Sequence, residues 1–271
     1  MSPPQSGPWH RLGAMSVHAY TALGVVLALL MVHMSYAGEV EIVLWLFLAA
    51  MIIDGSDGFL ARRFRVKEVV PGFDGALLDN IIDYITYAFA PMVLLWSAGY
   101  LPGGWLGGVV ASIPLLASCY QFCRSDAKTD DHFFVGFPSY WNIAAFYLIV
   151  LGASTAATTT TLLALTVLIF VPIKYVYPSR TETAWWLTMT LTTLWLGLYA
   201  LILVQYPAPS LWLIVLSGGY MLYYAALSLR LTLNRRNQIR DAAGSAIAAD
   251  GSSAVVGDEA VRQCPHCAAE V

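Results

Sequence analysis

Apolar residues run through most of the chain in stretches of about 20 residues. Such stretches predict transmembrane α-helices, because a hydrocarbon core of about 30 Å is crossed by about 20 residues at about 1.5 Å each. A transmembrane β-barrel would instead require segments of about ten residues in which apolar and polar positions alternate. The pattern therefore predicts an all-α fold, a polytopic bundle of helices integral to a membrane.

The basic residues divide this apolar chain into four long segments. No Lys or Arg lies between Arg11 and Arg62, Lys67 and Arg124, Lys128 and Lys174, or Arg180 and Arg230. Each segment holds two spans and has a turn signal, mostly Gly or Pro, near its middle, so each predicts a helical hairpin. The eight predicted spans are residues 16–35, 42–62, 75–98, 104–123, 139–154, 160–177, 184–204 and 210–230.

This arrangement places all 14 Lys and Arg residues on one side of the membrane. By the positive-inside rule that side is the cytoplasm, and both termini are expected there. Residues 1–233 are expected to form one membrane domain. From residue 234 to 271 the composition changes to Ala, Gly, Ser and mixed charge, which predicts a flexible cytoplasmic tail. The tail contains one C-x-x-C pair, Cys264 and Cys267, to which no function is assigned.

Composition and charge exclude two classes of protein. Hydrophobic residues make up 58% of the chain and charged residues only 11%, whereas roughly a quarter of the residues are charged in soluble domains. A soluble globular fold is therefore excluded, and the lipid bilayer is the expected surrounding. A net charge of −3 and the lack of a Lys/Arg-rich run argue against nucleic acid as a partner.

Four aspartates stand out against this low charge. Asp54 and Asp57 lie near the end of the second predicted span and are spaced i, i+3; Asp79 and Asp83 lie near the start of the third and are spaced i, i+4. Each pair projects from one helix face, and neighbouring helices of the bundle can bring the two faces together. A buried Asp costs about 2.5–3.5 kcal/mol in a membrane, so four of them need compensation.

Divalent cations can supply that compensation. Carboxylate oxygens favour Mg²⁺ or Mn²⁺, and four carboxylates suit two ions about 3.5–4 Å apart, the arrangement used in phosphoryl chemistry. The alternative is a cation-coupled transporter that uses the carboxylates as its ion site. The acidic motif has no counterpart in the second half of the chain, which argues against an internal repeat of the transporter kind.

The motif resembles the signature of a known family. The patterns D-x-x-D-G-x-x-A-R and G-x-x-x-D-x-x-x-D are formed by Asp54, Asp57, Gly58, Ala61, Arg62, Gly75, Asp79 and Asp83. They resemble the signature of the CDP-alcohol phosphotransferases, integral membrane enzymes that join an alcohol to a phosphate carried by CDP. Twelve residues separate Arg62 from Gly75, and this long insert, the eight spans and the segment 136–142 resemble the branch that uses choline. The resemblance runs from about residue 16 to residue 232.

The resemblance implies a role for each signature residue. Asp54, Asp57 and Asp79 would hold two Mn²⁺ or Mg²⁺ ions, and Asp83 would complete the site and act as the general base. The CDP-lipid would be bound at Gly58, Ala61, Arg62 and Gly75, where the small residues make room for the nucleotide and Arg62 contacts the anionic part of the substrate or orients the carboxylates.

The implied reaction transfers the phosphatidyl group from CDP-diacylglycerol to choline and yields phosphatidylcholine and CMP. A transferase of the same family that uses inositol, inositol phosphate or glycerol phosphate is the alternative. The resemblance also implies a bacterial inner membrane with the active site facing the cytoplasm. The oligomeric state is left open between a monomer and a homodimer.

Choline has a quaternary ammonium group, which aromatic faces and nearby carboxylates hold. The candidates on the predicted cytoplasmic side are Tyr84, Asp126, Tyr140, Trp141 and Asn142. Interfacial Tyr and Trp also occur without any ligand, which leaves a purely structural role open for each of them. An anionic alcohol would need cations such as Arg124, Lys128, Lys174 and Arg180, which are also expected on this side.

Overall fold

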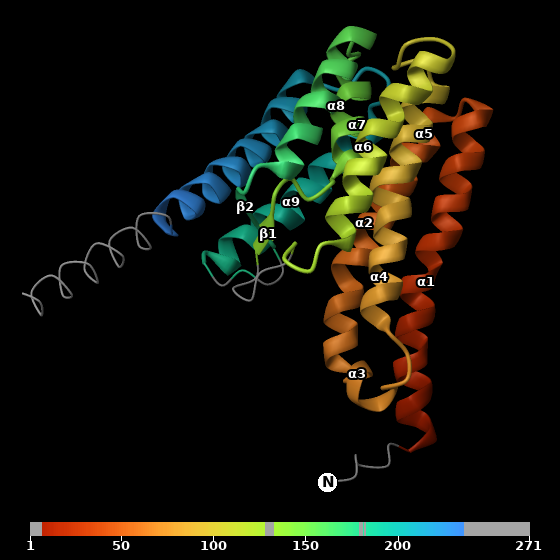
Figure 1. The fold of residues 1–271 in the computed structure, drawn as a ribbon, viewed down its shortest axis with the longest axis vertical. Coiled ribbons are helices and arrows are strands. Elements are labelled where there is room, and N and C mark those ends of the chain that lie inside the picture. Colours follow the sequence, from red (N-terminus) through yellow and green to blue (C-terminus); the bar gives the residue numbers. More distant parts are fainter. Residues whose placement is uncertain (1–6, 128–132, 179–180, 182, 236–271) are drawn as a thin grey trace, which may run out of the picture.

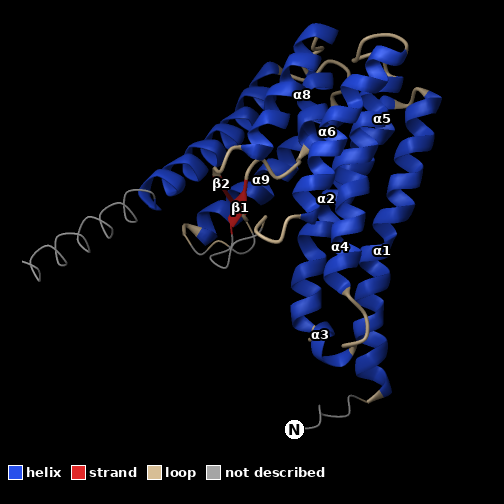
Figure 2. Cartoon of the chain, viewed as in Figure 1, coloured by secondary structure: helices blue, strands red, loops and turns tan. Residues whose placement is uncertain are grey.

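The structure is a computed structural model, and it describes residues 7–127, 133–178, 181 and 183–235. Helices form nearly all of this part of the chain, and they pack as a bundle (Figures 1 and 2). The predicted helical membrane bundle is confirmed, with one addition: a two-stranded sheet. The predicted tail, with Cys264 and Cys267, lies outside the described residues apart from its first two positions.

The elements follow the chain in a simple order. The first half contains α1 (Pro8–Ala37), α2 (Val40–Arg63), α3 (Val66–Val69), α4 (Gly75–Asp83), the π-helical segment η1 (Tyr84–Phe89), α5 (Ala90–Ser97) and α6 (Trp105–Cys123). The second half contains β1 (Phe133–Val135), α7 (Trp141–Val150), α8 (Thr155–Phe170), β2 (Lys174–Val176) and α9 (Trp185–Val204). A final helix, Leu211–Arg235, runs to the end of the described chain.

Six helices of the described chain are long and apolar enough to cross a membrane, and α4, η1 and α5 together form one of them. They agree with six of the eight predicted spans to within a few residues, except that α1 begins about eight residues early and the final helix ends about five residues late. The other two predicted spans correspond to α7 and α8, which have only 10 and 16 residues. A count of eight spans therefore stays a prediction.

The sixth predicted span, 160–177, was wrong in its boundaries. Helix α8 begins five residues earlier because Ser154 caps it, its hydroxyl accepting a hydrogen bond from the Ala157 N–H at 3.3 Å. It ends at Phe170, two residues before Pro172, because a proline disfavours helical backbone in the residue before it. Residues 174–176 form β2 instead, which pairs antiparallel with β1.

The β1–β2 pair fixes the segment that leads into α7. Phe133 lies opposite Val176, and Val135 lies opposite Lys174. Gly136 follows β1 at φ +85°, and a Cβ atom there would lie 2.1 Å from the carbonyl oxygen of Ile169. Only glycine fits both this backbone conformation and this close approach. The sheet therefore holds the start of α7 against the end of α8.

Helix α1 packs closely against α2 and α4, which carry the signature. A Cβ atom on Gly24 would lie 2.4 Å from Cγ2 of Ile82, so the absence of a side chain lets α1 approach α4. On the other side of α2, the Tyr199 hydroxyl of α9 donates to the carbonyl of Leu44. The buried core lies between these helices and includes the stacked rings of Phe146 and Tyr199, whose centroids are 3.7 Å apart.

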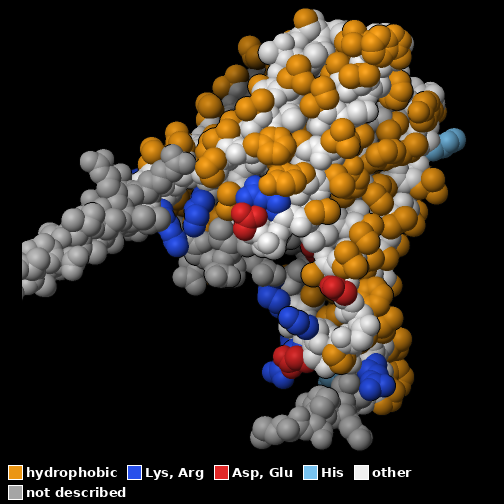
Figure 3. All heavy atoms as spheres, viewed as in Figure 1, with side chains coloured by type: hydrophobic (Ala, Val, Ile, Leu, Met, Phe, Trp, Pro, Cys, Tyr) orange, Lys and Arg blue, Asp and Glu red, His pale blue; other side chains and the backbone are white. Residues whose placement is uncertain are grey.

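The outer surface divides into two regions. Hydrophobic side chains cover the upper part of the bundle, and Lys and Arg side chains gather toward the lower part (Figure 3). The first described residues of α1 and the end of the helix Leu211–Arg235 both lie away from the apolar upper end (Figure 1). This distribution is what the predicted hairpins require, since each hairpin returns the chain to the basic side.

Candidate active site

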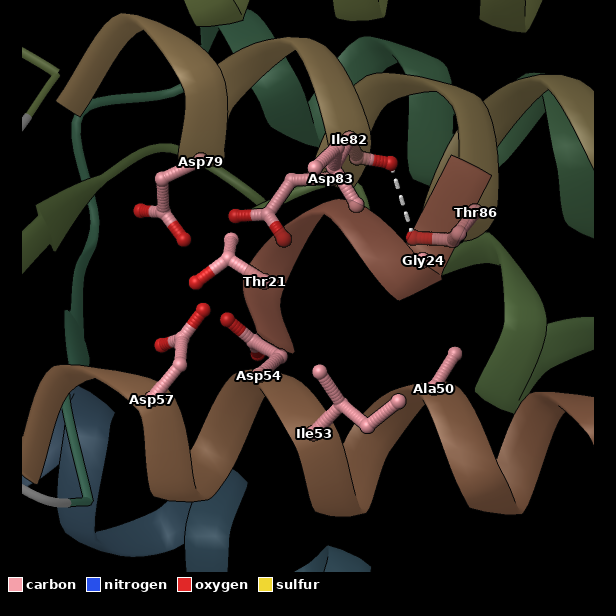
Figure 4. A pocket seen from close by; sticks show the side chains of 10 residues that line it. All are labelled: Thr21, Gly24, Ala50, Ile53, Asp54, Asp57, Asp79, Ile82, Asp83 and Thr86. Carbon is pink, nitrogen blue, oxygen red and sulfur yellow. Dashed lines mark hydrogen bonds between the residues drawn. The ribbon is translucent and has the colours of Figure 1, made fainter. Parts of the chain in front are cut away.

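The two acidic faces predicted from the sequence meet in the structure. Asp54 and Asp57 on α2 and Asp79 on α4 each offer a carboxylate oxygen, and these oxygens all lie within 4.8 Å of one another. They line a small pocket between α1, α2 and α4. Figure 4 shows the carboxylates of the two helices pointing toward the same space.

Asp83 lines the same pocket at the end of α4. In Figure 4 its carboxylate lies beside that of Asp79 and faces α2. Hard carboxylate oxygens at this spacing fit a divalent cation, because one ion can bind three of them and offset their mutual repulsion. The three carboxylates that lie close enough together to share one ion are those of Asp54, Asp57 and Asp79.

Local structure places these carboxylates. The i, i+3 and i, i+4 spacings put each pair on one helix face, as predicted. Helix α4 begins where it does because the Asp74 carboxylate accepts hydrogen bonds from the N–H groups of Ala76 and Leu77, at 3.1 and 3.0 Å. This cap fixes the start of α4 four residues before Asp79, and so determines which part of α2 Asp79 faces.

Two side chains that the site prediction did not include hold the carboxylates from behind. The Tyr87 hydroxyl, from η1, donates a hydrogen bond of 2.7 Å to Oδ2 of Asp54. The Thr21 hydroxyl, from α1, lies within hydrogen-bonding reach of Asp57 and lines the pocket (Figure 4). Donors of this kind orient carboxylates for metal binding. No sequence spacing indicated Thr21, since it lies 33 residues before Asp54.

The small signature residues have different neighbours. A Cβ atom on Gly58 would meet only the Arg62 side chain, at 3.4 Å, so the space beside Gly58 is otherwise open. A Cβ atom on Gly75 would lie 2.7 Å from the His18 ring of α1. Ala61 packs against a small buried cluster that includes Ala14 and Val17, also of α1. Gly75 and Ala61 therefore let α1 approach the motif, whereas Gly58 leaves room beside the pocket.

His18 is another residue that the sequence did not single out. Its ring is buried beside Phe73, with the ring centroids 4.3 Å apart, and its Nε2 atom has no hydrogen-bond partner among the described residues. It lies one turn before Thr21 on the same helix. The α1 face that covers the motif is thus lined by His18, Thr21 and Gly24.

Comparison with known proteins agrees with this geometry. The profile described as CDP-alcohol phosphatidyltransferase matches residues 15–231, which include every signature residue and all six long helices in whole or in part. The chain belongs to the CDP-alcohol phosphatidyltransferase family. It is therefore an integral membrane enzyme of the transferase class, and divalent metal binding by its aspartate cluster is consistent with that family.

Relatives within the family resemble the chain over most of its length. The phosphatidylcholine synthase of Legionella pneumophila subsp. pneumophila is 41% identical over 226 residues, which cover 81% of this chain and 88% of that protein. The phosphatidylcholine synthase of Pseudomonas aeruginosa is 39% identical over 202 residues, 74% of this chain and 84% of that protein. The phosphatidylcholine synthase of Borreliella burgdorferi is 37% identical over 179 residues, 66% of this chain and 76% of that protein.

Among the residues predicted to bind choline, Tyr140 interacts with residues of the signature site. Its ring centroid lies 5.9 Å from that of Tyr87, and the Asp54 carboxylate acts on it electrostatically. Trp141 points elsewhere: it is fully buried, and its indole N–H donates to the Ser118 hydroxyl at 2.6 Å. The two neighbours in sequence therefore have different surroundings.

The other three candidates lie around the same region without converging on one point. Tyr84 faces α6, where its hydroxyl donates to the Leu115 carbonyl. Asn142 is buried at the start of α7, and its Oδ1 accepts a hydrogen bond from the Ile143 N–H. Asp126 accepts two hydrogen bonds from Arg124, of 2.8 and 2.7 Å, and this hydrogen bonding lowers the pKa of the Asp126 carboxyl.

Proposed function

We propose that this chain transfers the phosphatidyl group of CDP-diacylglycerol to choline, giving phosphatidylcholine and CMP. The observation that carries the proposal is the convergence of Asp54, Asp57 and Asp79 within 4.8 Å, in a chain whose relatives are phosphatidylcholine synthases. The site lies among helices long and apolar enough to span a membrane, which suits a reaction that joins a lipid to a soluble alcohol.

The carboxylates divide the chemical work. Asp54, Asp57 and Asp79, with Asp83 beside them, would hold two Mg²⁺ or Mn²⁺ ions, which when bound offset the charge of the diphosphate and of the departing phosphate. Asp83 accepts the proton of the choline hydroxyl. The choline oxygen then forms a bond to the phosphorus that carries diacylglycerol, the bond from that phosphorus to the CMP phosphate breaks, and CMP leaves.

The remaining signature residues bind the CDP-lipid. Gly58 borders open space beside the carboxylates, so a flat nucleotide can approach the α2 backbone there. Arg62 lies one turn further along α2, is exposed, and offers a cation to the phosphates. Ala61 and Gly75 contribute by letting α1 close against the motif.

We also place the reaction on the cytoplasmic side of a bacterial inner membrane. Two observations support this placement. The carboxylates lie in the half of α2 that ends at Arg62 and Arg63, and the basic side chains gather on that side of the molecule (Figure 3). Choline and CMP are water-soluble, so this orientation lets both exchange with the cytoplasm.

The direct test is an assay of the purified protein with CDP-diacylglycerol, Mn²⁺ or Mg²⁺, and a panel of alcohols. We expect choline-dependent release of CMP and formation of phosphatidylcholine, both abolished by EDTA and restored by added metal. If CMP is released with inositol or glycerol phosphate but not with choline, then that alcohol, and not choline, is the acceptor. Without release for any alcohol, cation transport by reconstituted protein would be the next measurement.

The role of Asp83 has its own test. Asp83→Asn removes the proton acceptor, so we expect turnover to fall by about 10²-fold or more while binding of CDP-diacylglycerol persists. Glu68→Gln, which alters an exposed carboxylate on α3 outside the pocket, is the control and should retain full activity. If Asp83→Asn also abolishes lipid binding, its main role is metal ligation.

A further inference from the structure

Five aromatic side chains from distant parts of the sequence meet beside the carboxylates. This aromatic cluster consists of Tyr87, Phe134, Tyr140, Tyr177 and Tyr224, from η1, β1, the residue before α7, the residue after β2 and the final helix. Ring centroids are 5.9 Å apart for Tyr87 and Tyr140, 6.4 Å for Phe134 and Tyr140, and 4.7 Å for Phe134 and Tyr177. Tyr140 and Tyr224 are joined by a side-chain hydrogen bond.

The cluster adjoins the acidic pocket directly. The Tyr87 hydroxyl donates to Asp54 at 2.7 Å, and Tyr87 also lies within electrostatic reach of Asp83. Tyr140 in turn lies within electrostatic reach of Asp54. A molecule held against these rings would therefore have carboxylates at one end. A positive charge beside the rings would be favoured twice, by the aromatic faces and by the nearby acidic groups.

A cleft leads to the cluster from the side of α6. It encloses about 150 Å³, and Phe134 forms part of its wall together with Asn80, the residue after Asp79. This volume is below the roughly 300–1,000 Å³ of sites for drug-sized ligands, so the cleft suits only a compact molecule such as a small alcohol. Since Phe134 belongs to both the cleft and the cluster, a ligand in the cleft would lie against the edge of the cluster, next to the helix that carries Asp79.

The charge of the cleft disfavours an anionic alcohol. Among the described residues that line it, Arg124 is the only cation, and Asp126 binds it through two hydrogen bonds. The positive charge of Arg124 is thus already paired with a carboxylate of the protein. An alcohol that carries a phosphate would have to compete with Asp126 for this arginine, whereas a cationic alcohol would not.

We propose that the aromatic cluster binds the quaternary ammonium group of the acceptor alcohol and directs its hydroxyl toward Asp83. This inference rests on the proposed function, which it extends by giving choline a site. Of the residues considered from the sequence for this role, Tyr140 is part of the site. The rings of Tyr87, Phe134, Tyr177 and Tyr224 replace Tyr84, Trp141, Asn142 and Asp126.

The test uses the full-length protein in lipid nanodiscs, with saturating CDP-diacylglycerol and metal. Tyr140→Leu removes a ring from the cluster, and we expect KM for choline to rise by about tenfold while KM for CDP-diacylglycerol stays within about twofold. Tyr140→Phe keeps the ring and should stay close to wild type. Tyr36→Leu, an exposed position at the far end of α1, is the matched control. Phe134→Leu gives a second ring removal if Tyr140→Leu fails to fold.

Two further measurements separate ligand recognition from structural support. Tetramethylammonium, which has the cation but no hydroxyl, should compete with choline in the wild-type enzyme, and its inhibition constant should rise in Tyr140→Leu. The wild type should also prefer choline to dimethylethanolamine and ethanolamine, and the ring-removal variants should lose that preference. A merely structural role would leave the order of preference unchanged.

The outcomes distinguish this proposal from the proposed function. If the wild type uses an anionic alcohol and not choline, the proposed function fails, and the choline site fails with it. If the wild type uses choline, but tetramethylammonium does not compete or both leucine variants bind choline normally, then only the aromatic site is overturned.

Discussion

Gly58 and Gly75 are the two glycines of the signature, and they have different surroundings. Gly58 faces open space beside the pocket, and Gly75 lies under the His18 ring. We expect Gly58→Ala to leave thermal stability unchanged and to raise KM for CDP-diacylglycerol, because the added methyl group fills space that the nucleotide needs. Thermal unfolding and initial-rate kinetics on the same preparations would measure both effects.

Gly75→Ala should behave in the opposite way. The new Cβ atom would lie 2.7 Å from the His18 ring, so α1 must shift, and we expect a loss of about 1–3 kcal/mol of stability. The double variant His18→Ala/Gly75→Ala should recover part of that loss. If Gly75→Ala is as stable as wild type and only lipid binding suffers, then Gly75 contacts the nucleotide directly.

The hydrogen bond from Tyr87 to Asp54 predicts an effect on metal affinity. Tyr87→Phe keeps the ring but removes the donor, so we expect the Mn²⁺ concentration for half-maximal activity to rise by about tenfold while KM for choline changes little. Tyr20→Phe is the control, since the Tyr20 hydroxyl of α1 is hydrogen-bonded to the Ser56 hydroxyl of α2. Equal metal dependence in the two variants would contradict this role for Tyr87.

At this scale the sequence predicted which carboxylates converge and missed the side chains that contact them. The four aspartates were recognisable because helical spacing alone puts Asp54 with Asp57 and Asp79 with Asp83. Thr21 and His18 carry no such signal: they reach the site because α1 packs on α4, and that packing depends on Gly24 facing Ile82. Of the proposed acceptor rings, Tyr140 was among the residues predicted from the sequence, whereas Phe134 and Tyr177 carry no sequence signal, because the pairing of β1 with β2 brings them together.

Among the elements, the β1–β2 pair is the one on which the aromatic cluster depends, and Gly136 is its tightest point. Gly136→Ala combines a positive φ of 85° with a Cβ contact of 2.1 Å to the Ile169 oxygen. We expect a loss of about 2 kcal/mol or more, together with a higher KM for choline. Gly152→Ala is the matched control, since Gly152 also has positive φ but has no atom within 4 Å of its Cβ position.

The long helices were predictable and the short ones were not. Hydropathy alone is enough to predict a membrane helix of 19 to 30 residues, such as α1, α2, α6 or α9, because nearly every position in it must be apolar. For α8 the two ends depend on single residues, the Ser154 cap and Pro172. In the sequence, Lys174–Val176 looks like the end of an apolar helix. Only its pairing with Phe133–Val135 makes it a strand.

At the scale of the whole molecule, the final helix clamps the sheet from outside. The Thr232 hydroxyl accepts a hydrogen bond of 2.8 Å from the Lys174 N–H, and the Ser228 hydroxyl accepts one of 3.1 Å from the Val176 N–H. The membrane domain predicted to end at residue 233 should thus need this helix to its last turn.

Two truncations test this division of the chain. A protein that ends at Arg235 should retain activity and choline affinity within about twofold, since the family match ends at residue 231. A protein that ends at Ala226 loses both clamps on β2, and we expect its KM for choline to rise more than its KM for CDP-diacylglycerol. Loss of activity in the longer protein would place an essential element beyond Arg235.

The close packing of α1 on α2 and α4 also concerns how the enzyme is made. All four carboxylates, Thr21 and Tyr87 lie within the first 97 residues, whereas the other rings of the aromatic cluster span residues 134–224. During synthesis the residues of the proposed phosphate-handling half are therefore translated before the other rings of the aromatic cluster, which are proposed to recognise the alcohol. The order of synthesis thus separates in time the two parts of the site, each of which is proposed to bind one of the two substrates.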